Sequence, residues 1–103
     1  MIRHIVAVRF EQTVSMDTKA ALFAELEELR HLVDGVLDFH VGANVSPETA
    51  VVHGYLDAFW FDFADEAARD AYLVHPAHQA IGAKLVASVQ GGTDGIVVVD
   101  LKV

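Results

Sequence analysis

The sequence has 103 residues and no cysteine, so it is long enough for one domain, expected over residues 1–103, and it excludes disulfides, thiol nucleophiles and thiolate metal sites. Its formal net charge of −8 is opposite to the basic surface that nucleic acids and anionic membranes select, so neither is expected as a partner. Hydrophobic residues make up 53% and the mean hydropathy is +0.36, which indicates apolar surface that a partner covers.

The N-terminal residues lead directly into a strand-like pattern, without the layout of a secretory signal. No apolar run in the sequence is long enough to span a bilayer. Together these features predict a cytoplasmic protein.

The first predicted element is a strand over residues 2–10, in which apolar side chains alternate with polar ones. His4 lies on the same face as Val6, Val8 and Phe10. A histidine in such a row is either a satisfied core residue or a functional group at the edge of a pocket.

Leucine and valine then repeat at steps of three and four over residues 16–33, which predicts an amphipathic helix. Thr13 or Ser15 can cap its N-terminus, and Gly35 suits the left-handed position that closes a helix. The glutamates of this segment are expected on a solvent-exposed face rather than in a metal site.

Two further strands are predicted over residues 36–45 and 51–63, joined by a turn rich in Asn, Ser and Pro. Alternate residues of the longer strand form an aromatic face: Tyr55, Asp57, Phe59, Phe61 and Phe63. A carboxylate in that row must be paired, protonated or at a pocket edge, unless it lies at an exposed strand end. The opposite face, with Leu56, Ala58 and Trp60, is also largely apolar, so both faces need a cover.

Pro76 divides the next helical region, because proline ends a preceding helix and is well suited to begin a new one. The first helix starts near Asp65 and carries Tyr72 in its last turns, and the second runs to about residue 88. His78 falls in the first turn of the second helix, where the helix dipole and apolar neighbours favour a neutral imidazole that can accept a proton. The alternative is that His75 caps the second helix and His78 is structural. The two histidines have no evident third ligand, so no intrinsic metal is expected.

A glycine-rich link over residues 91–95 precedes a last, valine-rich strand over residues 96–103 that is interrupted by Asp100. The element order β-α-β-β-α-β, with the second helix divided, predicts an α+β ferredoxin-like fold with one antiparallel four-stranded sheet and helices on one face. The other face of the sheet would remain exposed to water. A symmetric homodimer in which two such faces meet is therefore expected.

Five segments resemble the stress-responsive A/B barrel domain (Dabb) family of the dimeric α+β barrel superfamily, and together they span nearly the whole chain. The segments are Ile2–Val6, Gly42–Glu48, Gly54–Tyr55, Tyr72–His78 and Val98–Asp100. The Tyr-x-x-His-Pro-x-His motif together with the N-terminal histidine is specific for this family. The resemblance implies a ferredoxin-like fold and a homodimer whose sheets close into a barrel.

The best-understood relatives resemble plant polyketide cyclases, which close a linear polyketide by aldol condensation without a cofactor. In them, residues that match His4, Tyr72 and His78 line a pocket between the sheet and the helices. The resemblance implies that His78 is the general base, that Tyr72 places it or binds the substrate oxygen, and that His4 supports it. Asp57 stands where those relatives have another histidine of the pocket, and from there it could orient His4 or His78.

The expected function is therefore acid–base catalysis, with no cofactor, on a small apolar or aromatic carbonyl compound. Its expected catalytic residues are His78, Tyr72, His4 and Asp57, and its expected ligand-binding residues are Tyr55, Phe59, Phe61 and His75. Haem ligation by a histidine, as in monooxygenases of the wider superfamily, has no independent support in the sequence. The alternatives are a stress-response or metabolite-binding dimer without turnover and a purely structural dimer.

Overall fold

Four strands form one antiparallel sheet in the order β2-β3-β1-β4 in the computed structural model, which describes all 103 residues. The central strands are β1 (Ile2–Val8) and β3 (Asp57–Phe63), and the edge strands are β2 (Val36–Ala43) and β4 (Ile96–Lys102). With the intervening helices this is the ferredoxin-like βαββαβ fold, which confirms the expectation from the sequence.

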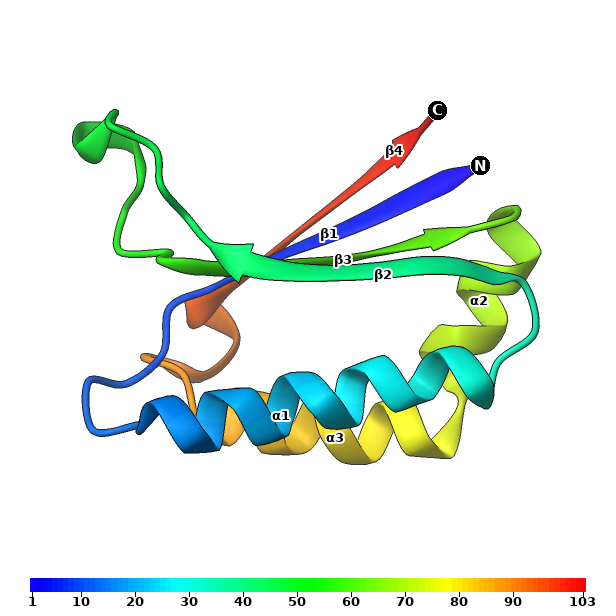
Figure 1. Ribbon diagram of the computed structural model, residues 1–103, viewed down its shortest axis with the longest axis horizontal. Coiled ribbons are helices and arrows are strands. Elements are labelled where there is room, and N and C mark those ends of the chain that lie inside the picture. The colour runs from blue at the N-terminus through cyan, green and yellow to red at the C-terminus, as the bar shows by residue number, and fades with distance from the viewer.

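The three α-helices all lie on one side of the sheet: α1 (Met16–Glu28), α2 (Glu66–Val74) and α3 (Pro76–Ala87) (Figure 1). α1 and α3 pack side by side, and α2 crosses from the end of β3 to the start of α3. None of these helices is long and apolar enough to cross a membrane. Three short 3₁₀ turns complete the chain: Leu29–His31, Thr49–Val51 and Gly92–Gly95.

Local signals define most of the helix ends, but the helix predicted over residues 16–33 ends at Glu28 and tightens into the 3₁₀ turn Leu29–His31. The Ser15 hydroxyl accepts a hydrogen bond from the Thr18 amide at the start of α1. After the helical region, Gly35 has a φ of 87°, and a Cβ added there would lie 2.6 Å from the Cβ of Ala68 in α2. Glycine is therefore required at this turn both for its conformation and for the close approach of α2.

Pro76 separates α2 from α3 because the residue before it is forced into extended backbone. His75 adopts φ −67° and ψ 132°, and its Nδ1 atom accepts a hydrogen bond from the Ala77 amide 3.1 Å away. His75 is thus the N-cap of α3.

The core lies between the inner face of the sheet and the helices. Phe59, Phe61 and Phe63 project inward from β3 and are almost completely buried, as is Tyr72 of α2. The aromatic row predicted for this strand therefore forms the centre of the core.

The expected strand over residues 51–63 is wrong in its first part, because β3 begins only at Asp57. His53 and Gly54 adopt left-handed backbone, with φ of 55° and 79°, and this interrupts the extended chain. Residues 44–56 form a loop that rises on the side of the sheet opposite the helices (Figure 1). Tyr55 and Leu56 belong to this loop and not to the faces of the strand.

No helix covers the outer face of the sheet, to which β1 contributes Arg3, Ile5 and Ala7. Trp60 lies opposite Ile5 on this face and stacks on His40 with ring centroids 4.7 Å apart. Its indole N–H is shielded from water and has no hydrogen-bond partner. Three side chains of β4 are nearly half exposed here: Val97, Val99 and Leu101.

Candidate functional site

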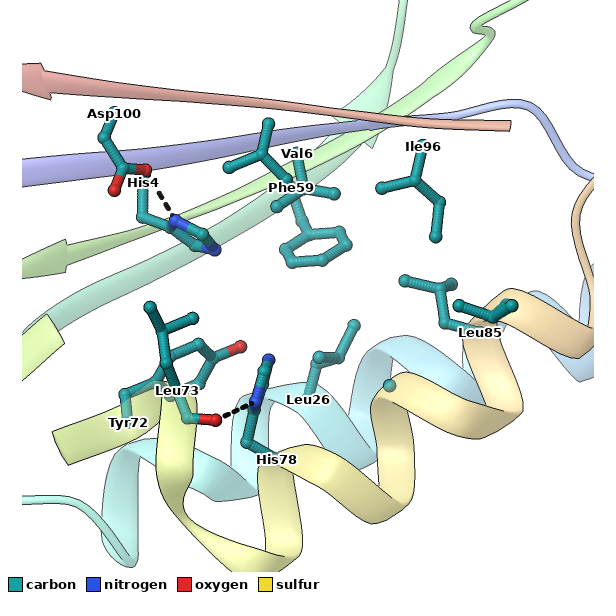
Figure 2. A pocket seen from close by; sticks show the side chains of 13 residues that line it. His4, Val6, Leu26, Phe59, Tyr72, Leu73, His78, Leu85, Ile96 and Asp100 are labelled. Atoms are coloured by element: carbon teal, nitrogen blue, oxygen red, sulfur yellow. Dashed lines mark hydrogen bonds and ion pairs between the residues drawn. The ribbon is translucent and has the colours of Figure 1, made fainter. Parts of the chain in front are cut away.

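A cavity of about 330 Å³ opens between the inner face of the sheet and the three helices (Figure 2). Most of its wall is apolar, and the polar side chains gather at one end. The lining residues are His4, Val6, Leu26, Phe59, Tyr72, Leu73, His78, Gly82, Leu85, Val86, Ile96, Val98 and Asp100.

His4 reaches the cavity from the middle of β1, and only 5% of the residue is exposed. Its Nδ1 atom lies 2.6 Å from Oδ1 of Asp100, its direct partner in the β1–β4 register. An ionised carboxylate can only accept hydrogen bonds, so Nδ1 of His4 carries the hydrogen. In the neutral ring Nε2 is then an unprotonated acceptor, and Figure 2 shows that side of the ring facing the cavity.

Tyr72 projects from the last turns of α2 and lies between the two histidines of the cavity. Its ring centroid is 5.8 Å from that of His4 and 4.3 Å from that of His78. Burial raises the pKa of the Tyr72 phenol well above its usual value, so the hydroxyl keeps its proton. Figure 2 shows this hydroxyl directed into the cavity, where it can donate a hydrogen bond to a ligand.

His78 enters from the first turn of α3, with Nδ1 3.1 Å from the carbonyl oxygen of Leu73. A carbonyl oxygen also only accepts, so Nδ1 carries the hydrogen and Nε2 faces the cavity as an acceptor. Burial lowers the pKa of His78, more than the hydrogen bond to Leu73 raises it, and positive charge on His4 or His75 lowers it further. The imidazole is therefore neutral at pH 7, in the direction that the sequence predicted.

These three rings form a compact polar group with complementary chemistry. Two imidazole Nε2 atoms accept protons or hydrogen bonds, and one phenolic O–H donates between them. No group of three or more histidine, aspartate and glutamate side chains is arranged to hold a metal ion.

Asp57, an expected catalytic residue, does not line this cavity. It is the first residue of β3, and its carboxylate is 3.1 Å from the ammonium group of Lys19 in α1. The pair lines a separate pocket near Phe10 and Gln90. Asp57 is therefore a paired carboxylate, one of the possibilities that the sequence left open, and it orients neither histidine.

Of the four expected ligand-binding residues, one lines the cavity and three do not. Phe59 lines the cavity, whereas Phe61 is completely buried behind Tyr72, with ring centroids 4.9 Å apart. Tyr55 lies in the loop after β2, and its hydroxyl donates a hydrogen bond to the Asp94 carbonyl 2.6 Å away. His75 uses its ring to cap α3. The structure thus brings together His4, Phe59, Tyr72 and His78 and leaves Asp57, Tyr55, Phe61 and His75 outside the lining.

Asp100 is a polar residue of the cavity that sequence reasoning did not predict as a site residue, having noted it only as an interruption of the last strand and as part of the Val98–Asp100 segment of the family resemblance. A signal existed, because β1 and β4 are neighbours in the ferredoxin-like sheet, and His4 and Asp100 each interrupt a row of apolar residues. Arg69 of α2 binds the other side of this carboxylate, with Nη1 3.0 Å from Oδ2.

The fold and the site together define a class: a ferredoxin-like α+β protein with an apolar, histidine-bearing pocket under its sheet. The chain matches the family model described as Stress responsive A/B Barrel Domain (Dabb) over residues 2–103, and it belongs to this family.

Its relatives include a dimeric ferredoxin-like protein of unknown function from Jannaschia sp. CCS1. That structure is 40% identical, with a TM-score of 0.89, and the match covers 99% of this chain and 98% of that one. The stress-response A/B barrel domain-containing protein HS1 of Arabidopsis thaliana is 28% identical over 101 residues, 98% of this chain and 88% of the relative. The hydroxynitrile lyase of Passiflora edulis shares the fold with a TM-score of 0.84 at 17% identity, over 99% of this chain and 92% of that one.

Proposed function

We propose that this protein binds a small, neutral, largely apolar carbonyl compound in the cavity and catalyses proton transfer on it without a cofactor. The observation that carries the proposal is the contact of Tyr72 with both His4 and His78 at one end of an apolar cavity of about 330 Å³. This volume is near the lower end of the usual range for ligand sites, roughly 300–1,000 Å³.

The lining residues also favour a neutral ligand. No lysine or arginine lines the cavity, and its one charged group, Asp100, is a carboxylate already bound to His4 and Arg69. A ligand carboxylate or phosphate would therefore be buried without a cation to pair with it, which is costly. An aldehyde, a ketone or a β-dicarbonyl compound meets no such penalty.

In the proposed reaction, Nε2 of His78 removes a proton from the carbon next to the carbonyl group. The electron pair of that C–H bond moves to the carbonyl oxygen, where the Tyr72 O–H stabilises the enolate by a hydrogen bond. If the ligand carries a second carbonyl, the enolate carbon attacks it and the imidazolium returns its proton to the new alkoxide. This is the aldol chemistry of the plant polyketide cyclases, to which the resemblance in the Tyr-x-x-His-Pro-x-His motif led.

Two features of the site support His78 as the base. Its Nδ1–H is held by Leu73, so Nε2 is already the unprotonated atom, and burial keeps the ring neutral near pH 7. His4 offers a second acceptor across the Tyr72 ring and can receive or share the transferred proton.

We propose, further, that the protein acts as a homodimer through the outer face of its sheet. The Jannaschia relative is dimeric, and the outer face here exposes Val97, Val99 and Leu101 and has no helix over it. The shielded, unpartnered indole N–H of Trp60 lies on this same face.

Proton exchange in D₂O tests the catalytic proposal without knowledge of the natural product. Neutral aromatic ketones and β-dicarbonyl compounds are screened for binding by ligand-observed NMR, and the binders are then followed for deuterium uptake at the α-carbon. Uptake is expected with the native protein and is expected to be lost in His78→Gln and in Tyr72→Phe, both of which keep the side chain's size. His31→Gln, at an exposed histidine outside the cavity, is the control and should behave as the native protein does.

Binding without deuterium uptake would support the non-catalytic metabolite-binding dimer instead. Failure of every neutral carbonyl compound to bind, or equal uptake in His78→Gln, would contradict the proposed function.

A further inference from the structure

We infer that Arg69 and Asp100 act as a positioning pair that fixes the tautomer of His4, so that Nε2 of His4 is presented to the cavity as an acceptor. The tautomer is a property of the free protein, and only its chemical use rests on the proposed function. The sequence analysis assigned no site role to Arg69 or Asp100.

The carboxylate of Asp100 is bound on both oxygens by different partners. Oδ1 lies 2.6 Å from Nδ1 of His4, and Oδ2 lies 3.0 Å from Nη1 of Arg69. Rotation of the carboxylate would break one contact or both. The Asp100 side chain is 27% exposed and that of Arg69 is 23% exposed, so water competes only partly for these bonds.

Three different elements hold this network in place. His4 and Asp100 are directly opposite in the β1–β4 register, which keeps their Cβ atoms about 5 Å apart. Arg69 lies on α2 three residues before Tyr72, so the same helix carries the arginine that holds Asp100 and the phenol that lines the cavity. The acceptor and donor sides of the site are thus positioned together.

His4 has no other acceptor for its Nδ1–H. The aromatic rings that pack against it are Phe63 and Tyr72, with centroids 6.1 Å and 5.8 Å away. Phe63 cannot accept a conventional hydrogen bond, and the Tyr72 hydroxyl lies on the cavity side of the ring. Asp100 is therefore the group that decides which nitrogen of His4 carries the hydrogen.

Arg69 determines which way an amide at position 100 would point, so the substitution Asp100→Asn can reveal its effect on the tautomer of His4. In Asp100→Asn the guanidinium can only donate, so it should retain the amide oxygen on its own side. The amide NH₂ then faces Nδ1 of His4 and donates to it, which forces the hydrogen onto Nε2. Replacing a carboxylate by an amide in this way is known to impose the wrong histidine tautomer in the serine-protease triad.

The test is the ¹⁵N chemical shifts of the His4 ring, measured in protein with labelled histidine at a pH where the ring is neutral and without ligand. The native protein is expected to show a protonated Nδ1 and an unprotonated Nε2. Asp100→Asn is expected to exchange these two signals. In the double variant Asp100→Asn with Arg69→Met, the amide is free to turn its oxygen toward His4, and a substantial return to the Nδ1–H form is expected.

Asp70→Asn is the matched control, because Asp70 also binds Arg69 but does not contact His4. It should leave the His4 signals unchanged, and backbone amide spectra confirm that each variant is folded. The inference is overturned if native His4 carries its hydrogen on Nε2, if Asp100→Asn keeps the native tautomer, or if the double variant matches Asp100→Asn. These readouts need no substrate, so they stand or fall separately from the deuterium-exchange test of catalysis.

Discussion

At the scale of single residues, the site depends on which atoms are left without partners. His4 and His78 each use Nδ1 to bind an acceptor of the protein, a carboxylate in one case and a backbone carbonyl in the other. Both rings consequently turn an unprotonated nitrogen to the same apolar space. The pattern of hydrogen bonds, more than the mere presence of histidines, gives the cavity its acid–base character.

The lowered pKa of His78 should make folding stability depend on pH. Below the unfolded-state value of about 6.5, the unfolded chain binds a proton that the folded ring resists. The free energy of unfolding should therefore decrease as pH falls from neutrality through the folded-state pKa, and this part of the decrease should be missing in His78→Gln. Urea unfolding of both proteins between neutral pH and about pH 5 measures the difference, and a His78 pKa above about 6.5 by NMR would contradict the argument.

At the scale of elements, two glycines have different roles: one is required by the fold and the other borders the site. Gly35 closes the turn before β2 with a positive φ and touches α2, whereas Gly82 lies inside α3 and borders the cavity. A Cβ at Gly82 would meet no atom within 4 Å. A glycine within a helix costs stability, so its presence here leaves room at the cavity wall.

Alanine at these two glycines should have opposite effects. Gly35→Ala should destabilise the protein by about 1–3 kcal/mol, because of its strained φ and its clash with Ala68. Gly82→Ala should stabilise it by up to about 1 kcal/mol through helix propensity, while reducing the cavity volume. Chemical denaturation gives both values, and equal effects at the two positions would refute this account.

The elements that the sequence predicted well are those with strong local signals. Pro76, the capping Ser15 and the alternation in the strands lead directly to the ferredoxin-like order. The start of β3 could not be placed, because residues 51–56 continue the apolar pattern and only the left-handed backbone at His53 and Gly54 ends it. Asp57 was predicted in the site and lies outside it, whereas Asp100 was not predicted there and lines the cavity. The reason is related: their partners, Lys19 and His4, depend on packing and strand register that no single segment of the sequence reveals.

At the scale of the whole molecule, the two faces of the sheet differ: helices cover the inner face, and no helix covers the outer face. The inner face has a packed core and the cavity, and the outer face has exposed valines and a tryptophan with an unsatisfied N–H. The Arg3–Asp62 ion pair crosses this outer face, with 2.9 Å between Nε and Oδ1. A second copy of the same face would cover these groups with matching apolar surface.

The native chain should therefore sediment as a species of about 22 kDa, twice the 11.2 kDa of one chain. Val99→Asp should convert it to a folded monomer, because Val99 is 45% exposed within one chain and its replacement leaves the core intact. Trp60→Asp should dissociate or unfold it, since an unpaired charge would be buried at the interface. Ala20→Asp on the exposed side of α1 is the control, and a native monomer at micromolar concentration would exclude the sheet-face dimer.

The position of β4 at the sheet edge has a consequence for the life of the protein in a cell. β4 presents an open row of backbone N–H and C=O groups beside a run of three valines, Val97 to Val99, and this combination promotes cross-strand aggregation. Because aggregation requires chains to meet, this open edge should make the protein more prone to aggregate at high expression than at low expression.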